Sequence, residues 1–208
     1  ENNGYYCDNI DMKSIPEGLS KNIKVSVIAI KSKIKRNHKI GLKEIETTSN
    51  LFTFLYSIFK TFKKEKTNYL LISITPYSFF AYLLLFIFRK KVIVYLRSDG
   101  HEEYKTILGF IGPPIYHIMY TFVTFNSEII TCQKRLVKKR NYNLVFPSEI
   151  DANWTQNISK PFIGKPKLLY VGRIKVEKGI FSLLKIFEKI TNDVELSILG
   201  KEENIKIN

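Results

Sequence analysis

The segment Lys167–Gly200 constrains the fold of this chain more than any other stretch. It reads as an apolar strand, a Gly-Arg turn, a basic loop with Lys178 and Gly179, an amphipathic helix and a second apolar strand. This order predicts one β-α-β unit. In open α/β sheets, ligands bind where a strand gives way to a helix, and a helix N-terminus at that point favours anions. We therefore expect an anion site beside the Gly-Arg turn.

Strands and helices alternate through the rest of the sequence as well. Apolar runs predict buried strands at 24–30, 90–96, 127–132 and 143–147, and a short strand at 43–48. Helical spacing predicts helices over 51–62, capped by Asn50, and over 114–125, with a short or broken helix at 11–19 around Pro16. This alternation predicts an α/β fold with mostly parallel sheets.

The uncharged run Tyr69–Phe88 has three interpretations. Its twenty residues are long enough to span a bilayer, and Arg89, Lys90 and Lys91 follow it. The first residues are rich in strand formers, however, and Pro76 is favourable in the first turn of a helix. A strand, a helix starting at Pro76 and the next strand would form a buried β-α-β unit, which we favour over a spanning helix or an apolar helix lying against a membrane.

The formal charge of +14 is compatible with a nucleic acid, an anionic membrane or a phosphorylated substrate as partner. No arginine-rich tract points to nucleic acid, so none is expected, and solvated lysines alone would also explain the charge. The two cysteines, Cys7 and Cys132, lack metal-binding or redox spacing. Cys132 follows an apolar run and is expected in the core, and no signal peptide is visible, which indicates the cytoplasm.

The run LLYVGRIKVEKG, followed by an amphipathic helix and ELSILG, resembles the opening of the C-terminal domain of family 4 GT-B glycosyltransferases. Those enzymes have two Rossmann-like domains facing a cleft, and VFPSEID before the linker is similar to their acceptor domain. The resemblance implies a Rossmann-like acceptor-side domain over 1–150 that lacks its first strand, and a linker at 151–166. Residues 167–208 would then open a truncated nucleotide-sugar-binding domain.

The resemblance also implies roles for three residues on the donor side. Arg173 and Lys178 match the family's cations that contact the donor diphosphate, and Gly172 would let the backbone approach the donor. Fixed cations stabilise the charge that develops on a leaving diphosphate, so no metal and no cofactor beyond the nucleotide-sugar donor is expected. The family's two sugar-binding glutamates would lie after Asn208, so the chain is expected to be inactive alone.

On the acceptor side, the polar segment SDGHEEY follows the strand at 90–96 and is expected to be a loop. Asp99 or His101 would orient or deprotonate the acceptor hydroxyl, and Arg97 would contact an acceptor phosphate. An ordinary polar loop with a turn at Asp99 is the alternative. His38, in a basic loop, and His117, in a helix, are expected to be structural or solvated, and no metal site is expected.

The sequence therefore predicts a glycosyltransferase that moves a sugar from a nucleotide donor to a cell-envelope glycan or a lipid-linked acceptor. Its basic charge and apolar helices suit peripheral contact with the anionic inner membrane surface. Three alternatives stay open: a non-catalytic GT-B-like scaffold or anion-binding module, a basic nucleic-acid binder, and a transmembrane protein.

Overall fold

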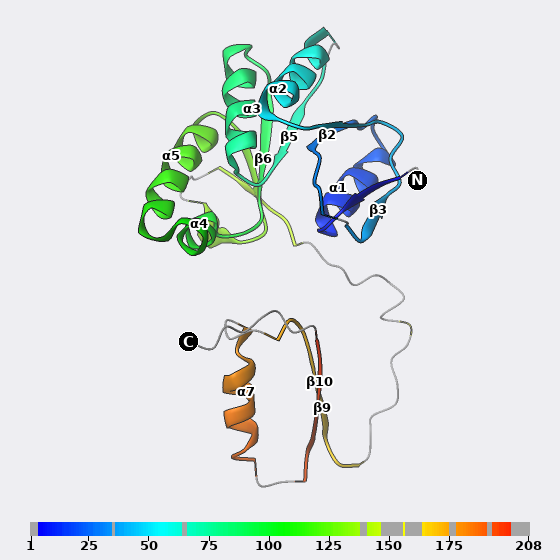
Figure 1. Cartoon of the computed structure of the whole chain (residues 1–208), viewed down its shortest axis with the longest axis vertical. Coiled ribbons are helices and arrows are strands. Elements are labelled where there is room, and N and C mark those ends of the chain that lie inside the picture. Colours follow the sequence, from blue (N-terminus) through cyan, green and yellow to red (C-terminus); the bar gives the residue numbers. More distant parts are fainter. Residues whose placement is uncertain are drawn as a thin grey trace. The chain divides into compact units, whose positions relative to one another are not determined.

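The computed structural model describes residues 4–34, 36–63, 66–137, 141–146, 156, 164–174, 178–190 and 193–200. Its architecture is mixed α/β with parallel sheets (Figure 1). The chain divides into two compact units, 1–147 and 148–208. Most of the expected linker at 151–166 lies outside the described residues.

The first unit contains most of the secondary structure. Its strands are β1 (Tyr5–Cys7), β2 (Val27–Ile30), β3 (His38–Ile40), β4 (Ile45–Thr48), β5 (Tyr69–Ile72), β6 (Val92–Leu96), β7 (Glu128–Thr131) and β8 (Asn143–Leu144). Its helices are α1 (Asp11–Ser20), α2 (Leu51–Lys60), α3 (Pro76–Ile87), α4 (Gly100–Leu108) and α5 (Gly112–Phe125), with short 3-10 turns η1 (Thr61–Lys63), η2 (Gly109–Ile111) and η3 (Lys134–Leu136).

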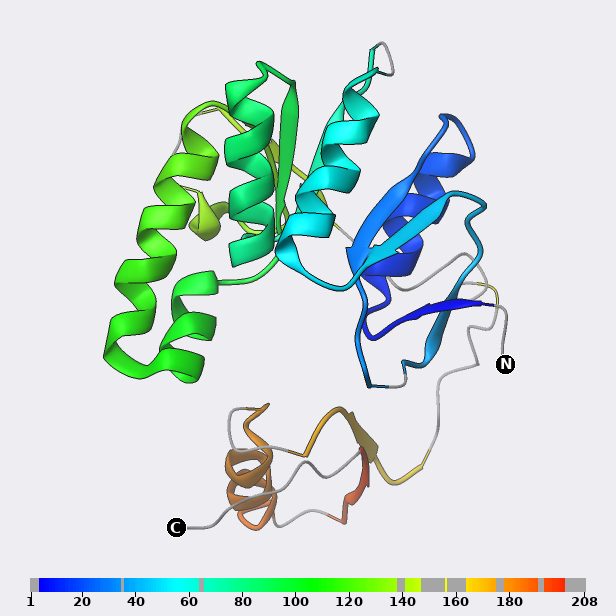
Figure 2. The same ribbon diagram turned by 45° about the horizontal axis from the view of Figure 1, so that its top comes forward.

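The centre of this unit is a four-stranded parallel sheet in the order β5-β6-β7-β8. Strand β6 is largely buried, and Val94 is fully enclosed. Helices α2, α3 and α5 lie side by side with α3 in the middle (Figure 2). The core gathers where α3 and α5 meet the sheet, around Leu85 and Val123.

The run Tyr69–Phe88 is a strand followed by a helix, as we expected from Pro76. Thr75 caps α3 by accepting a hydrogen bond from the backbone N–H of Ser78, and the Ser78 hydroxyl lies 2.7 Å from the N–H of Thr75. Strand β6 pairs parallel with β5 and completes the predicted β-α-β unit. The interpretation of this run as a spanning helix was wrong, because its first residues belong to a sheet.

Helices α4 and α5 form a hairpin. Gly109 between them has φ 65°, a left-handed conformation that breaks a continuous helix. The His101 and Tyr116 rings are 4.8 Å apart, whereas residues 101 and 116 would be separated by about 22 Å along one straight helix. By length and composition the stretch 100–125 is one helical candidate for a membrane span among the described residues. Its folding back argues against a single span.

Two small sheets complete the first unit. β2 pairs parallel with β4, and β1 pairs antiparallel with β3. The antiparallel pair was not predicted, and it corrects the placement of His38, which lies in β3 and not in a loop. The expected strand at 24–30 is shorter and only partly buried, since β2 covers its last four residues.

The short helix expected at 11–19 is confirmed, and α1 runs unbroken through Pro16. Two other expectations for this unit need adjustment. The predicted buried strand at 143–147 is only the two-residue β8, and both of its residues are exposed at the edge of the sheet. Cys132 is half-buried and not a core thiol, because it follows β7 at the end of the sheet, while Cys7 is buried.

The second unit contains β9 (Lys167–Val171), α7 (Ile180–Phe187) and β10 (Glu195–Leu199). The two strands pair in parallel, Lys167 opposite Glu195 and Val171 opposite Leu199, so the predicted β-α-β unit is confirmed. Gly200 packs against the carbonyl oxygen of Gly172 so closely that a Cβ at Gly200 would overlap it. Among the described residues of this unit most apolar side chains are exposed, and Ile180 is a buried exception.

Candidate functional site

The carboxyl ends of β5, β6 and β7 lie next to one another. The register pairs Ile72 with Tyr95 and Leu96 with Thr131, so all three strands stop at the same edge. This is the edge where open α/β sheets bind ligands. The predicted acceptor-side residues Arg97, Asp99 and His101 follow β6 at this edge.

Arg97 is held by a partner that the sequence analysis missed. Its guanidinium Nη1 donates to Oδ2 of Asp11 at 2.9 Å, and both side chains are about one quarter exposed. Asp11 lies in the first turn of α1, so the pair ties that helix to the end of β6. The guanidinium has more donors than this pair uses. Arg97 can therefore contact an anion while it stays bonded to Asp11.

Asp99 is the N-cap of α4. Its Oδ1 accepts a hydrogen bond from the backbone N–H of His101 at 3.1 Å. The segment predicted as a polar loop is therefore mostly the first turns of a helix, and this expectation was wrong. Asp, Gly and two glutamates in a row are good signals for a helix start, which the loop interpretation overlooked.

His101 lies between a carboxylate and a second histidine. Its Nδ1 is 3.7 Å from Oδ1 of Asp99, and its Nε2 is 3.4 Å from Nδ1 of His117. The His101 ring also meets Tyr116 edge to face, with centroids 4.8 Å apart. The structure thus brings together Asp99 and His101, the two alternatives for the acceptor hydroxyl, and adds His117 from α5.

The group of Asp99, His101 and His117 can move a proton. A carboxylate beside one imidazole nitrogen orients the ring, which is the arrangement that supports general-base chemistry. A proton taken up by His101 can be shared with His117 across the 3.4 Å contact. The side chain of His101 is about one third exposed, so a solute can reach the ring.

The buried Tyr116 packs against the His101 ring. Burial raises the pKa of its hydroxyl far above the ordinary value, with smaller contributions from neighbouring Tyr120 and Glu103. Tyr116 therefore stays neutral throughout the physiological range. Gly100 lies so close to its ring that any Cβ there would overlap it, which explains why the α4 start has glycine after the cap.

The donor-side residues lie in the second unit. The N–H of Gly172 donates to the carbonyl of Leu199 at 3.0 Å, so Gly172 continues the pairing of the two strands. Arg173 follows it and is exposed, and its carbonyl accepts a hydrogen bond from the Tyr170 hydroxyl at 3.2 Å. Lys178 is exposed immediately before the Gly179 start of α7.

The start of α7 has the character of an anion site. Gly179 adopts φ 73°, and no side chain caps the helix among the residues that the structure describes. Backbone N–H groups in the first turn of a helix attract anions. Cations on both sides of the β9–α7 connection strengthen that attraction, although residues 175–177 between them lie outside the described part.

Sequence reasoning missed Asp11 and treated His117 as structural or solvated. Asp11 lies 86 residues from Arg97, and no local pattern links them. His117 reaches His101 only because the chain folds back at Gly109, so the spacing of 16 residues carried no signal. Within the described ranges no cluster of three or more His, Cys, Asp or Glu side chains forms a metal site.

Comparison with known proteins adds no assignment. No family model matches the sequence, and no curated protein or solved structure matches it either.

Proposed function

We propose that this chain belongs to a metal-independent glycosyltransferase of the GT-B type that transfers a sugar from a nucleoside diphosphate donor. The observation that carries the proposal is the parallel β9–α7–β10 unit, which has Arg173 at the end of its first strand and Lys178 at the start of its helix. This is the arrangement that the resemblance to family 4 enzymes leads one to expect. It also suits a diphosphate on physical grounds alone.

In the proposed reaction, an acceptor hydroxyl attacks the anomeric carbon while the bond from that carbon to the diphosphate oxygen breaks. Arg173 and Lys178 stabilise the negative charge that the leaving nucleoside diphosphate gains. His101, oriented by Asp99, accepts the hydroxyl proton. The acceptor is a cell-envelope glycan or a lipid-linked sugar, and Arg97 contributes a donor to a phosphate on it while keeping its bond to Asp11.

Binding of UDP, GDP and ADP to the chain tests the donor side directly. Arg173→Ala and Lys178→Ala should each weaken the tightest-binding diphosphate about tenfold or more, because each removes a charged contact. Lys167→Ala is the matched control, since it removes an exposed lysine at the opposite end of β9. Equal losses in all three variants, or no diphosphate binding at all, would contradict the proposed donor site.

Sugar transfer tests the acceptor side. Release of nucleoside diphosphate from UDP- and GDP-sugars is followed with a membrane-lipid extract as acceptor, using a protein that carries this chain together with the two sugar-binding glutamates of the family pattern. His101→Ala should lower the rate about a hundredfold while diphosphate affinity stays unchanged. If diphosphates bind at Arg173 and Lys178 but no donor supports transfer, the non-catalytic anion-binding alternative is the better description.

A further inference from the structure

The opposite edge of the central sheet, where β5, β6 and β7 begin, has a surface that the proposed reaction does not use. Helices α2 and α3 both end there. The ring of Phe88, just after α3, lies 5.5 Å from that of Phe59 and 5.0 Å from that of Phe62. Phe59 and Phe88 stay 46% and 45% exposed, and Ile87 beside them is 71% exposed. Large apolar side chains therefore gather at this edge without being buried.

Cations are interleaved with these rings. The Nζ of Lys60 lies over the Tyr56 ring at 5.0 Å, and the Nζ of Lys90 lies over the Phe62 ring, also at 5.0 Å. A shallow hollow of about 400 Å³ is lined by four aromatic rings and by Lys60, Lys63 and Lys90, and none of the described residues that line it is a carboxylate. Lys60 also contacts Glu46 at 3.4 Å.

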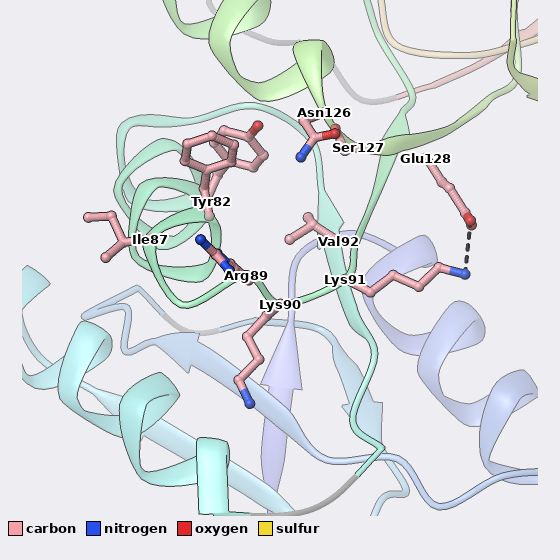
Figure 3. A pocket seen from close by; sticks show the side chains of 10 residues that line it. Tyr82, Ile87, Arg89, Lys90, Lys91, Val92, Asn126, Ser127 and Glu128 are labelled. Carbon is pink, nitrogen blue, oxygen red and sulfur yellow. Dashed lines mark ion pairs between the residues drawn. The ribbon is translucent and has the colours of Figure 1, made fainter.

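A second, larger hollow of about 840 Å³ adjoins the first through Lys90. It lies between the ends of α3 and α5, and Arg89, Lys90 and Lys91 reach it from one short segment (Figure 3). Lys91 pairs with Glu128 at 2.9 Å. We call the residues that line the two hollows the basic aromatic edge. They come mainly from the ends of α2 and α3 and from the segments that follow these helices.

The end of α3 shows that a cation is placed here at a conformational cost. The N–H of Lys90 donates to the carbonyl of Leu85 at 2.9 Å, and the N–H of Arg89 donates to that of Phe86 at 3.0 Å. These two bonds form a Schellman motif, in which glycine is preferred at the left-handed position. Arg89 occupies that position with φ 52°.

Attraction to a helix C-terminus would account for cations at the ends of α2 and α3. It does not account for the exposed Phe86, Ile87 and Phe88 among them, which gain nothing from a helix dipole. Apolar side chains ringed by cations match the two layers of an anionic bilayer surface, its acyl boundary and its phosphate headgroups. A nucleic acid would need open ring faces for stacking, but the Phe62 face is covered by Lys90.

We infer that the basic aromatic edge docks this protein on an anionic membrane surface. Phe86, Ile87 and Phe88 enter the acyl boundary, while Lys63, Arg89 and Lys90 contact lipid phosphates. This docking does not depend on the proposed transfer reaction, because none of these residues belongs to the donor or acceptor sites. It leaves the opposite edge of the sheet, with Asp99 and His101, away from the contact.

Vesicle co-sedimentation of the whole chain tests the inference. Binding is compared for phosphatidylcholine vesicles with and without about 30% phosphatidylglycerol, over a series of salt concentrations. We expect binding only to the anionic vesicles, weakened by salt. The variant Lys63→Gln/Arg89→Asn/Lys90→Gln should lower the partition coefficient on the order of a hundredfold. Asparagine is chosen at position 89 because it tolerates the left-handed conformation.

Two control variants locate the contact. Lys105→Gln/Lys134→Gln/Arg135→Gln removes the same charge from exposed positions elsewhere in the first unit and should change binding less than threefold. Phe86→Ser/Ile87→Ser should weaken binding about tenfold. Ile107→Ser/Phe110→Ser, at the exposed tip of the α4–α5 hairpin, should leave it unchanged. Circular dichroism verifies the fold of each variant.

Several results would overturn the inference. If the two charge variants lost vesicle binding equally, the binding would depend on net charge and not on this edge. If Ile107→Ser/Phe110→Ser lost more binding than Phe86→Ser/Ile87→Ser, the membrane contact would lie at the hairpin tip. Absence of vesicle binding by the unmodified chain would refute it outright. The same would follow if the edge residues instead proved necessary for binding single-stranded RNA or for self-association in sedimentation velocity, without vesicle binding.

Discussion

The β5–α3–β6 and β9–α7–β10 units have the same order of elements and the same parallel pairing, but they differ in burial. In the first, Leu85 of α3 and Val94 of β6 are 0% exposed. In the second, Val171 of β9 is 66% exposed and Leu199 of β10 is 63% exposed. The local pattern is therefore equally well formed in both, while the packing is not.

The difference comes from neighbouring elements. The β5–α3–β6 unit is flanked by β7, α2 and α5, which pack against β6 and α3. Beside β9 and β10, the described part of the second unit offers one helix. Hydrophobic stabilisation grows with the apolar area removed from water. The same kind of sequence therefore stabilises the β5–α3–β6 unit far more than the β9–α7–β10 unit. Four sets of substitutions can break or sharpen this comparison.

The largest effect is expected from truncating a leucine in each helix. Leu85→Ala should lower the free energy of unfolding of the first unit by about 3 kcal/mol, because it leaves a cavity in a closed core. Leu184→Ala in α7, where the side chain is 37% exposed, should cost less than about 1 kcal/mol. Urea unfolding followed by amide hydrogen exchange measures the two units separately. Similar losses would show that α7 is buried in solution.

The next largest loss of stability is expected from replacing glycines that lie close to backbone atoms of another segment. A Cβ at Gly112 would overlap the Tyr104 carbonyl oxygen in the hairpin, so Gly112→Ala should cost about 2 kcal/mol. Gly200→Ala meets the Gly172 oxygen in the same way but should only loosen the β9–β10 pairing. Gly18→Ala, with open space around it in α1, should stabilise by about 0.5 kcal/mol. Thermal unfolding ranks the three variants, and a neutral Gly112→Ala would contradict the hairpin geometry.

The helix starts differ between the two units. Thr75→Ala removes the capping box of α3 and should cost the first unit about 1 kcal/mol. Gly179→Ala places a side chain at φ 73° before α7 and should cost about 1 kcal/mol of the second unit's smaller stability. Amide hydrogen exchange in α3 and in α7 measures the loss of stability in each variant. Thr75→Ser, which keeps the hydroxyl, serves as the control.

The smallest effect is expected at alkaline pH. Burial raises the pKa of Tyr116, Tyr82, Tyr95 and Tyr104, all in the first unit. The folded unit therefore keeps these protons at a pH where the unfolded chain has released them. Its stability should be unaffected below pH 10, the ordinary tyrosine pKa, and should fall as pH rises above that value. Tyr116→Phe should make the fall shallower, whereas Tyr56→Phe, which removes an exposed phenol, should leave it unchanged.

Much of the first unit could be predicted from the sequence. Asn50 and Pro76 mark helix starts through local chemistry, since a side-chain cap and a missing N–H act within one turn. Strand β6 follows from its run of apolar β-branched residues. The candidate site was predicted only in part. Asp99 and His101 are separated in the chain by one residue, but His117, which meets His101, comes from another helix.

The sequence by itself determined the α/β alternation, the β9–α7–β10 unit and the identity of the cations at its turn, because these depend on residues within a few turns of each other. The tertiary structure alone decided that Asp11 holds Arg97, that His117 meets His101, and that aromatic rings and lysines share one edge of the sheet. Each of these depends on a chain reversal or on helix packing. Such contacts join residues far apart in sequence, and no local pattern records them.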